Sequence, residues 1–325
     1  MNHQQEGLTL ICVQTSILYY AWQVEVMLNN FEQLGIHKHD VRCLFAYNKK
    51  EPDWESNLSH IKKVESKYSH IAKFFYYEDT RVYPISYLSS IRPNLLKQHY
   101  KEFPELSDRN VFYHDCDVVF TSYPYFLENI SQDSKWYVSD TKSYIGHNYI
   151  VSKGEDVLDK MCEIVGISKE LVKEKQEESG GAQYIIRGVN HDFFDKVEKD
   201  SERLFKEINI LNAEKKKADP THHELQIWAA DMWAILWNAW LLGYSTKIIP
   251  EMDFCWATDD ISQWDKKCIF HNAGVTHSSK NEFFYKADFR FNHPYNHECE
   301  TYFKDFASYK YFQLIKSVGN NSCLL

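Results

Sequence analysis

The sequence predicts an α/β fold in which a mostly parallel sheet carries helices on its faces. Short apolar runs typical of buried strands alternate with segments whose apolar residues recur at helical spacing, which is the pattern of strand–helix–strand units. The length of 325 residues fits one such domain with elaborations. Hydrophobic residues at 44% and charged residues at 26% match soluble globular chains, so a disordered or fibrous protein is excluded.

The elements in the first half of the chain are the clearest. An apolar run over 8–14 predicts a buried strand, and apolar residues at helical spacing over 17–34 predict a helix that Gly35 ends. Pro93 fits an early turn of a helix within 86–100. The further strands of this half are expected at 41–47, 71–77, 110–120 (interrupted by acids) and 136–140, with a polar helical stretch between the first two of these.

The second half is less regular. We interpret 223–242 as the most helical segment of the chain and the basic run 215–217 as a solvated loop. The other elements are expected to be helices near 154–165 and 168–178, a strand at 180–186, short aromatic-rich strands at 246–250, 268–271 and 283–291, and a terminal helix over 302–317.

Charge and cysteine usage narrow the functional class. The 37 basic and 46 acidic residues give a net charge of −9, which provides no general attraction to nucleic acid or anionic membranes. The eight cysteines are scattered without a C-x-x-C pair, as expected of free thiols in a reducing compartment. No run is long enough to span a bilayer, and the N-terminal stretch lacks the features of a signal peptide. We therefore expect a cytoplasmic protein.

Two acids interrupt the strand expected at 110–120. On a strand, Asp115 and Asp117 would face the same side about 6.5–7 Å apart, so that both carboxylates can flank one divalent cation. Oxygen ligands suit Mn²⁺ or Mg²⁺, which commonly bridge to phosphates. The alternative interpretation is a pair of solvated acids at a strand end, because a bare D-x-D pattern is frequent by chance.

The place of this pattern, after three strand–helix units, resembles that of the D-x-D motif in metal-dependent glycosyltransferases of the A-type fold. In those enzymes the acids hold Mn²⁺ on the diphosphate of a sugar nucleotide. The resemblance covers approximately residues 8–280 in order and spacing. It implies an A-type, Rossmann-like mixed sheet flanked by helices, with a nucleotide-sugar-binding core over 1–250. Residues 251–325 would form a C-terminal elaboration that completes the metal and acceptor site.

The resemblance assigns several polar residues to the donor. Arg92 is expected to contact phosphate or sugar, because its fork of N–H donors matches phosphate oxygens; the alternative is a surface arginine paired with an acid. Asp140 lies where related enzymes contact the donor sugar. In a chain with only 11 glycines, Gly180 and Gly181 predict a close backbone approach to a ligand, with Gln183 bonding sugar hydroxyls. A tight turn would explain the glycines but not the glutamine.

Asp231 is the one acid in an apolar helical stretch. A buried carboxylate is costly, so it is expected to have a charged or hydrogen-bonding partner or a functional role. The surrounding Trp-x-x-Asp-Met-Trp segment resembles peptidyl hydroxyproline and serine glycosyltransferases of plants and algae. Asp231 is then expected to bind acceptor or sugar hydroxyls or to act as a base; the alternative is an acid that pairs a core donor. We interpret the tryptophans as core residues rather than a sugar-stacking platform. Those enzymes usually carry a secretory anchor that this sequence lacks, which favours a viral, phage or bacterial source.

A late histidine completes the expected site. An apolar strand leads into His271, and Gly274 and Lys280 follow it. In many retaining A-type enzymes the histidine of such a pattern is the third protein ligand of the metal, with the glycine and a lysine near the phosphates. Neutral imidazole is a good Mn²⁺ ligand beside carboxylates, so Asp115, Asp117 and His271 form a chemically sensible set.

The resemblance therefore implies a metal-dependent glycosyltransferase that uses a UDP-sugar and a hydroxyl acceptor on a glycan, a protein or a small molecule, with neither nucleic acid nor membrane as a partner. We expect retention of anomeric configuration, although Asp231 or Glu251 could supply the base that inversion requires. Two other classes stay open. One is a sugar-nucleotide nucleotidyltransferase, although its usual glycine-rich basic signature after the first strand is missing. The other is a carbohydrate-binding protein without turnover.

Overall fold

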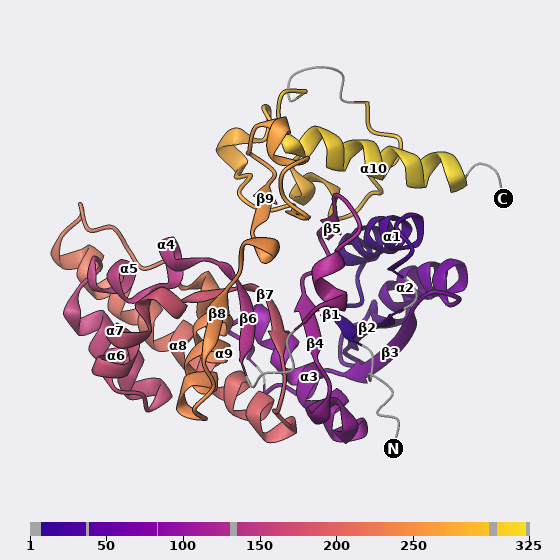
Figure 1. Cartoon of the computed structure of the whole chain (residues 1–325). Coiled ribbons are helices and arrows are strands. Elements are labelled where there is room, and N and C mark those ends of the chain that lie inside the picture. Colours follow the sequence, from indigo (N-terminus) through magenta and orange to yellow (C-terminus); the bar gives the residue numbers. More distant parts are fainter. Residues whose placement is uncertain (1–7, 37–38, 83, 131–134, 299–303, 323–325) are drawn as a thin grey trace. The chain divides into compact units, whose positions relative to one another are not determined.

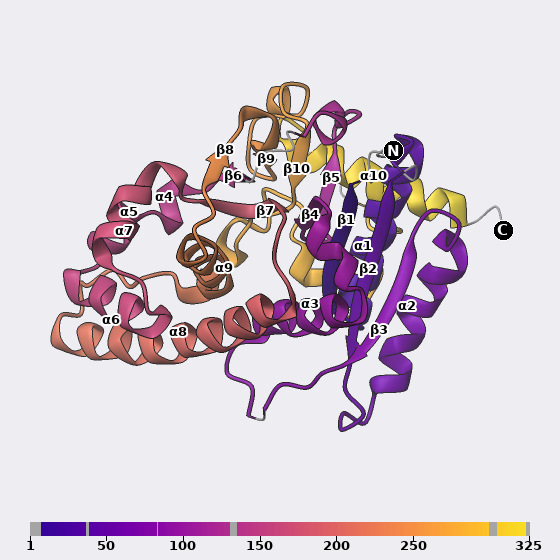
Figure 2. The same ribbon diagram turned by 60° about the horizontal axis from the view of Figure 1, so that its bottom comes forward.

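The computed structural model describes residues 8–36, 39–82, 84–130, 135–298 and 304–322 (Figures 1 and 2). The chain forms two compact units, each assembled from separate stretches of sequence. The first unit comprises Met1–Glu78, His114–Ser131 and Glu251–Leu325, and the second comprises Asp79–Tyr113 and Gln132–Pro250. The chain leaves the second unit for the first after Pro250. The expected division into a core over 1–250 and a C-terminal elaboration over 251–325 stays a prediction.

The first unit begins with three parallel strands in the order β3-β2-β1, covered by two helices. Six of the seven residues of β1 are buried, which fits a strand with both faces covered. The first helix ends before Gly35, whose φ of +72° is the left-handed conformation that glycine adopts most easily. The elements are β1 (Thr9–Thr15), α1 (Leu18–Gln33), β2 (Asp40–Tyr47), α2 (Trp54–Tyr68) and β3 (Lys73–Glu78).

A small second sheet in the same unit has the order β5-β10-β9. Its central strand β10 (Ile269–His271) runs parallel to β9 (Phe254–Trp256) and antiparallel to β5 (Val118–Phe120). Helix α10 (Ala307–Ser322) packs against α1 and, with it, encloses an aromatic core around Trp22. The strand expected at 268–271 is confirmed.

Two expectations for the C-terminal part of this unit need revision. The strand expected at 283–291 is wrong, because this segment contains only the 3₁₀ turn Lys286–Phe289. Its aromatic residues do not alternate across a sheet; Phe284 and Phe289 stack with ring centroids 5.3 Å apart against the core. The terminal helix begins at Ala307, and residues 302–303 of its expected start lie outside the described residues.

The second unit contains four strands in the order β4-β7-β6-β8. Strand β7 is antiparallel to β4 and β6, whereas β6 is parallel to β8, so the sheet is mixed rather than mostly parallel. The strands are β4 (Val111–His114), β6 (Trp136–Asp140), β7 (Gly180–Ile186) and β8 (Thr246–Ile248). The helices are α3 (Ile91–Glu102), α4 (Lys142–Ile145), α5 (His147–Val151), α6 (Glu155–Val165), α7 (Lys169–Glu174), α8 (His191–Ala218) and α9 (Ala230–Leu241).

Helix α8, with 28 residues, corrects the sequence interpretation. The basic run 215–217 is its last turn rather than a loop, and helix α9 covers only the later part of 223–242. The Asn190 side chain caps the N-terminus of α8 by accepting from two backbone N–H groups. Ion pairs four residues apart, such as Lys199 with Asp195, support the exposed face, while the opposite face is buried against α3 and α9. Among the described residues, no helix combines the length and apolar character needed to cross a membrane.

Candidate functional site

The two acids of the D-x-D pattern lie in a turn. Strand β4 ends at His114, and β5 begins at Val118, so Asp115 and Asp117 connect two strands that belong to different sheets. The expectation that both acids sit on one continuous strand is therefore wrong. Cys116, between them, is buried, while the two carboxylates converge on one neighbour.

That neighbour is His271, the last residue of β10, which follows Asp117 by 154 residues in the sequence. In the antiparallel β5–β10 pair, His271 lies opposite Val118, the residue directly after Asp117. The backbone N–H of Asn272 donates to the carbonyl oxygen of Asp117 at 3.0 Å and extends the pairing past the strand ends. The ladder between two short apolar strands thus fixes the histidine beside the acids.

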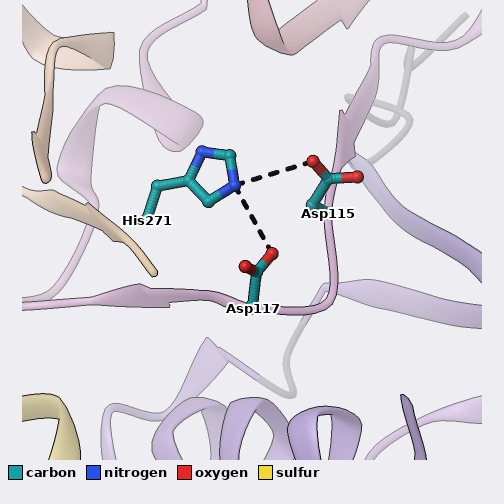
Figure 3. A group of neighbouring side chains, drawn as sticks. All are labelled: Asp115, Asp117 and His271. Carbon is teal, nitrogen blue, oxygen red and sulfur yellow. Dashed lines mark ion pairs between the residues drawn. The ribbon is translucent and has the colours of Figure 1, made fainter. Parts of the chain in front are cut away.

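The imidazole faces both carboxylates (Figure 3). Its Nε2 lies 3.4 Å from Oδ1 of Asp117 and 3.6 Å from Oδ2 of Asp115. The three potential ligand atoms all lie within 4.8 Å of one another. Two carboxylates and one imidazole nitrogen are a ligand set that suits Mn²⁺, and Mg²⁺ also binds carboxylate oxygens. The residues present therefore fit a divalent cation.

Lys286 also reaches this cluster, and the sequence interpretation missed it. Its ammonium contacts Oδ2 of Asp117. Burial alone would raise the pKa of Asp117, but Lys286 and His271 outweigh it and hold that pKa well below its usual range. The pKa of Lys286 is in turn raised, because the attraction of Asp117 outweighs burial. The carboxylate and the ammonium are both charged at neutral pH.

The position of Lys286 follows from aromatic packing. Its 3₁₀ turn ends at Phe289, whose carbonyl oxygen accepts from the indole N–H of Trp22 on α1 at 3.1 Å. Phe284, just before the turn, packs edge-to-face against the same indole at 6.1 Å. The only sequence signal for a partly buried ammonium was a lysine that follows aromatic residues of the core.

His114, the last residue of β4, is fully buried next to the acids. Its Nδ1 lies 2.9 Å from the carbonyl oxygen of Asp115, and its ring packs against Phe31. Burial lowers the pKa of His114 to about 4, so the imidazole is neutral at physiological pH.

Gly274 and Lys280 belong to the same unit as the acids, in the segment that follows β10. Gly274 has a φ of +89°, which explains a glycine at this bend. Lys280 follows the 3₁₀ turn His277–Ser279, whose N-terminus is closed by a capping box. A contact between Lys280 and phosphate stays a prediction.

In the second unit, Asp231 lies in the first turn of α9 and is 3% exposed. The hydroxyl of Tyr87 lies 2.5 Å from its Oδ1, and Arg92 pairs with its Oδ2 at 3.0 Å. Burial first, and then the Asp231 charge, raises the pKa of Tyr87 well above its usual value, so the tyrosine is a neutral donor. Two residues that the sequence assigned to different tasks, Arg92 and Asp231, are thus brought together. Their roles toward donor and acceptor stay predictions.

The remaining predicted residues of this unit lie on the neighbouring strands β6 and β7. Gln183 is fully buried, and its Oε1 accepts from the hydroxyl of Ser139 at 2.7 Å. Gly180 pairs with Asp140 and Gly181 with Ser139, next to an irregularity in the register. The half-exposed Asp140 carboxylate also accepts from the backbone N–H at the start of α4. A Cβ at Gly180 would lie 2.5 Å from the Ser139 carbonyl oxygen, so close strand packing explains this glycine.

Known proteins resemble this chain in structure rather than in sequence. No model of a known protein family matches it, and neither does any curated protein. The apo structure of the bifunctional glycosyltransferase WbbM has 10% identity and a TM-score of 0.51, and the match covers 99% of this chain and 51% of that one. The chain thus spans about half the length of WbbM.

Two further structures match less well. The galactosyltransferase LgtC, in complex with donor and acceptor sugar analogues, has 12% identity over 95% of each chain and a TM-score of 0.44. The glycosyltransferase GlyE of Streptococcus pneumoniae has 9% identity over 97% of this chain and 63% of that one, with a TM-score of 0.39. The mixed α/β architecture and the likeness to WbbM show that this chain has the A-type glycosyltransferase fold, as the sequence predicted.

Proposed function

We propose that the protein is a metal-dependent glycosyltransferase that transfers a sugar from a UDP-sugar to a hydroxyl acceptor with retention of anomeric configuration. The observation that carries this proposal is the convergence of Asp115, Asp117 and His271 on an A-type fold. A protein that only binds carbohydrate has no need of a cation at a nucleotide's diphosphate.

The cluster supplies the chemistry that departure of a nucleoside diphosphate requires. Asp115, Asp117 and His271 would hold Mn²⁺ or Mg²⁺, which when bound neutralises charge on the leaving diphosphate. Lys286 adds a fixed positive charge beside Asp117. A diphosphate at the cluster would therefore meet cationic charge from the chain itself.

The residues of the second unit are proposed to serve the sugar and the acceptor. Gln183 can offer hydrogen bonds to sugar hydroxyls, as can the Arg92–Asp231 pair. The carboxylate of Asp231 is already engaged by Tyr87 and Arg92, which favours binding over proton abstraction. We expect retention, because in that mechanism the leaving phosphate itself receives the acceptor proton and no separate base is needed.

The test is donor turnover with purified protein and a panel of UDP-sugars and GDP-sugars, measured as release of nucleoside diphosphate with and without Mn²⁺. We expect Mn²⁺-dependent hydrolysis of at least one UDP-sugar and its loss in Asp115→Asn, Asp117→Asn and His271→Ala. Lys280→Ala should keep most of the hydrolysis if Lys286 supplies the main positive charge.

Three outcomes would count against parts of the proposal. Glycan binding without hydrolysis of any donor under any metal condition would refute the proposed transferase and indicate a carbohydrate-binding protein instead. Turnover confined to GDP-sugars would show that the donor nucleotide is GDP rather than UDP. A product anomer of the opposite sense, read by NMR, would refute retention and make Asp231 or Glu251 the first candidate for the base.

A further inference from the structure

Lys286 competes with any cation for one of the two acids in the first unit. Its ammonium contacts Oδ2 of Asp117, whereas Oδ1 of the same carboxylate faces the imidazole of His271 at 3.4 Å. The carboxylate is therefore shared between the lysine and the metal-ligand set. The side chain of Asp117 is only 6% exposed, so salt and water screen this ion pair weakly.

The formal charges of the cluster weaken the binding of a divalent cation by itself. Asp115 and Asp117 carry two negative charges and Lys286 carries one positive charge, which leaves one net negative charge. A divalent cation would turn this into one net positive charge in a partly buried site, where uncompensated charge is costly. The cation must displace the ammonium from Asp117 or bind against its repulsion.

Lys286 is also equipped to bind an anion. An ammonium has three N–H donors, and Asp117 is the only hydrogen-bond partner of Lys286 among the residues that the structure describes. The packing of Phe284 and Phe289 against the core holds the backbone of the lysine, but its side chain is 30% exposed. The flexible stem lets the ammonium turn toward a ligand while the backbone stays in place.

A diphosphate supplies the negative charge that a divalent cation alone leaves unbalanced, and its oxygens accept strong hydrogen bonds from an ammonium. We propose that Lys286 exchanges partners: its ammonium pairs with Asp117 until a diphosphate binds, and then donates to a phosphate oxygen. This exchange frees Asp117 for the cation, so the metal and the diphosphate bind cooperatively. The inference rests on the proposed function for the diphosphate and adds the residue that couples the donor to the metal.

The experiment measures the affinity for Mn²⁺ by electron paramagnetic resonance, without an anion, with UDP and with inorganic pyrophosphate. The complexes that Mn²⁺ forms with either anion in free solution are titrated separately and subtracted. The coupling ratio is the affinity for Mn²⁺ with the anion divided by the affinity without it. We expect a ratio of about 100 for UDP in the wild type. Lys286→Met should bind Mn²⁺ alone about tenfold more tightly, which lowers the ratio to about ten or less.

Two further variants of Lys286 keep the test sharp. Lys286→Gln retains a polar side chain without charge and should behave like Lys286→Met, which covers the case in which the methionine variant folds poorly. Lys286→Arg keeps a positive charge that pairs with carboxylate or phosphate and should restore the ratio to within about threefold of the wild type. The matched control is Arg290→Met, which removes an exposed positive charge just after the same 3₁₀ turn and should leave the ratio unchanged, because salt screens exposed charges.

Three results would overturn the inference: Lys286→Met binds Mn²⁺ alone no more tightly than the wild type, its coupling ratio equals that of the wild type, or neither anion raises the affinity of the wild type for Mn²⁺. Failure of the proposed function gives a different pattern, because pyrophosphate would then raise the affinity for Mn²⁺ through Lys286 while UDP would not. A wild-type ratio for UDP in Lys286→Met would refute the role of Lys286 and leave the donor site intact.

Discussion

Substitution of Asn30 by alanine should damage both the fold and the metal cluster of the first unit. Asn30 is 4% exposed on α1, and its side-chain amide forms two hydrogen bonds with the backbone of Phe120 in β5. The amide donates to the Phe120 carbonyl at 3.0 Å, and its oxygen accepts from the Phe120 N–H at 2.9 Å. Strand β5 starts directly after Asp117, so this clamp fixes the strand that positions the acids.

The magnitude follows from the groups left without partners. Alanine would leave the buried N–H and the buried C=O of Phe120 unsatisfied, each at about 1–3 kcal/mol, which sums to about 2–6 kcal/mol of unfolding free energy. Asn29 is the matched control, because it is equally buried but its amide makes one longer bond, of 3.3 Å, to Ser317. Its loss should remove about 1 kcal/mol.

The assay combines urea unfolding with a Mn²⁺ titration followed by electron paramagnetic resonance. Asn30→Ala should lose stability and bind Mn²⁺ more weakly, whereas Asn29→Ala should bind Mn²⁺ like the wild type. Equal stability of the two variants would refute the clamp. A destabilised Asn30→Ala with unchanged Mn²⁺ affinity would show that β5 does not position the acids.

Three further predictions concern single residues. The free energy of unfolding in EDTA should fall by up to about 3 kcal/mol as the pH drops from 6.5 toward 4, because burial keeps His114 neutral in the folded protein while the histidine of the unfolded chain binds a proton. Urea unfolding at each pH measures this dependence, and His114→Gln should make it flatter. Lys286→Met should tighten Mn²⁺ binding about tenfold in calorimetry, since a cation no longer faces the ammonium, while Lys280→Met should not; weaker binding in Lys286→Met would contradict this. Gly180→Ala should lower the free energy of unfolding in urea by about 1–3 kcal/mol, because the added Cβ would clash with the Ser139 carbonyl oxygen. Unchanged stability would show that strand β6 shifts to accommodate the Cβ.

The sequence was most informative where a local pattern sets the structure. Apolar strands lead directly into Asp115 and His271, and such runs are buried wherever the chain places them. Neither pattern alone indicates that the two strands pair. The resemblance to A-type glycosyltransferases assigned the late histidine to the metal and thereby linked residues 154 positions apart. The same local reasoning predicted a strand at 268–271, and the structure confirms it as β10.

The sequence was least informative where contacts or charges hide the pattern. Helix α8 was missed because its surface carries many charges in pairs four residues apart, which lowers its hydropathy and resembles a solvated loop. Lys286 was missed because aromatic packing rather than sequence spacing brings it to Asp117. The partners of Asp231 come from a stretch more than 130 residues earlier, and no periodicity predicts such pairing.

The most direct test of a metal-held sugar-nucleotide site is calorimetric titration with UDP and with GDP, each with and without Mn²⁺, in the wild type and in Asp117→Ala. The proposal predicts that UDP binds only when Mn²⁺ is present, and that Asp117→Ala abolishes this binding while its thermal unfolding stays cooperative. The absence of binding to either nucleotide under every metal condition would contradict the proposal, as would UDP binding that is equally strong without the metal.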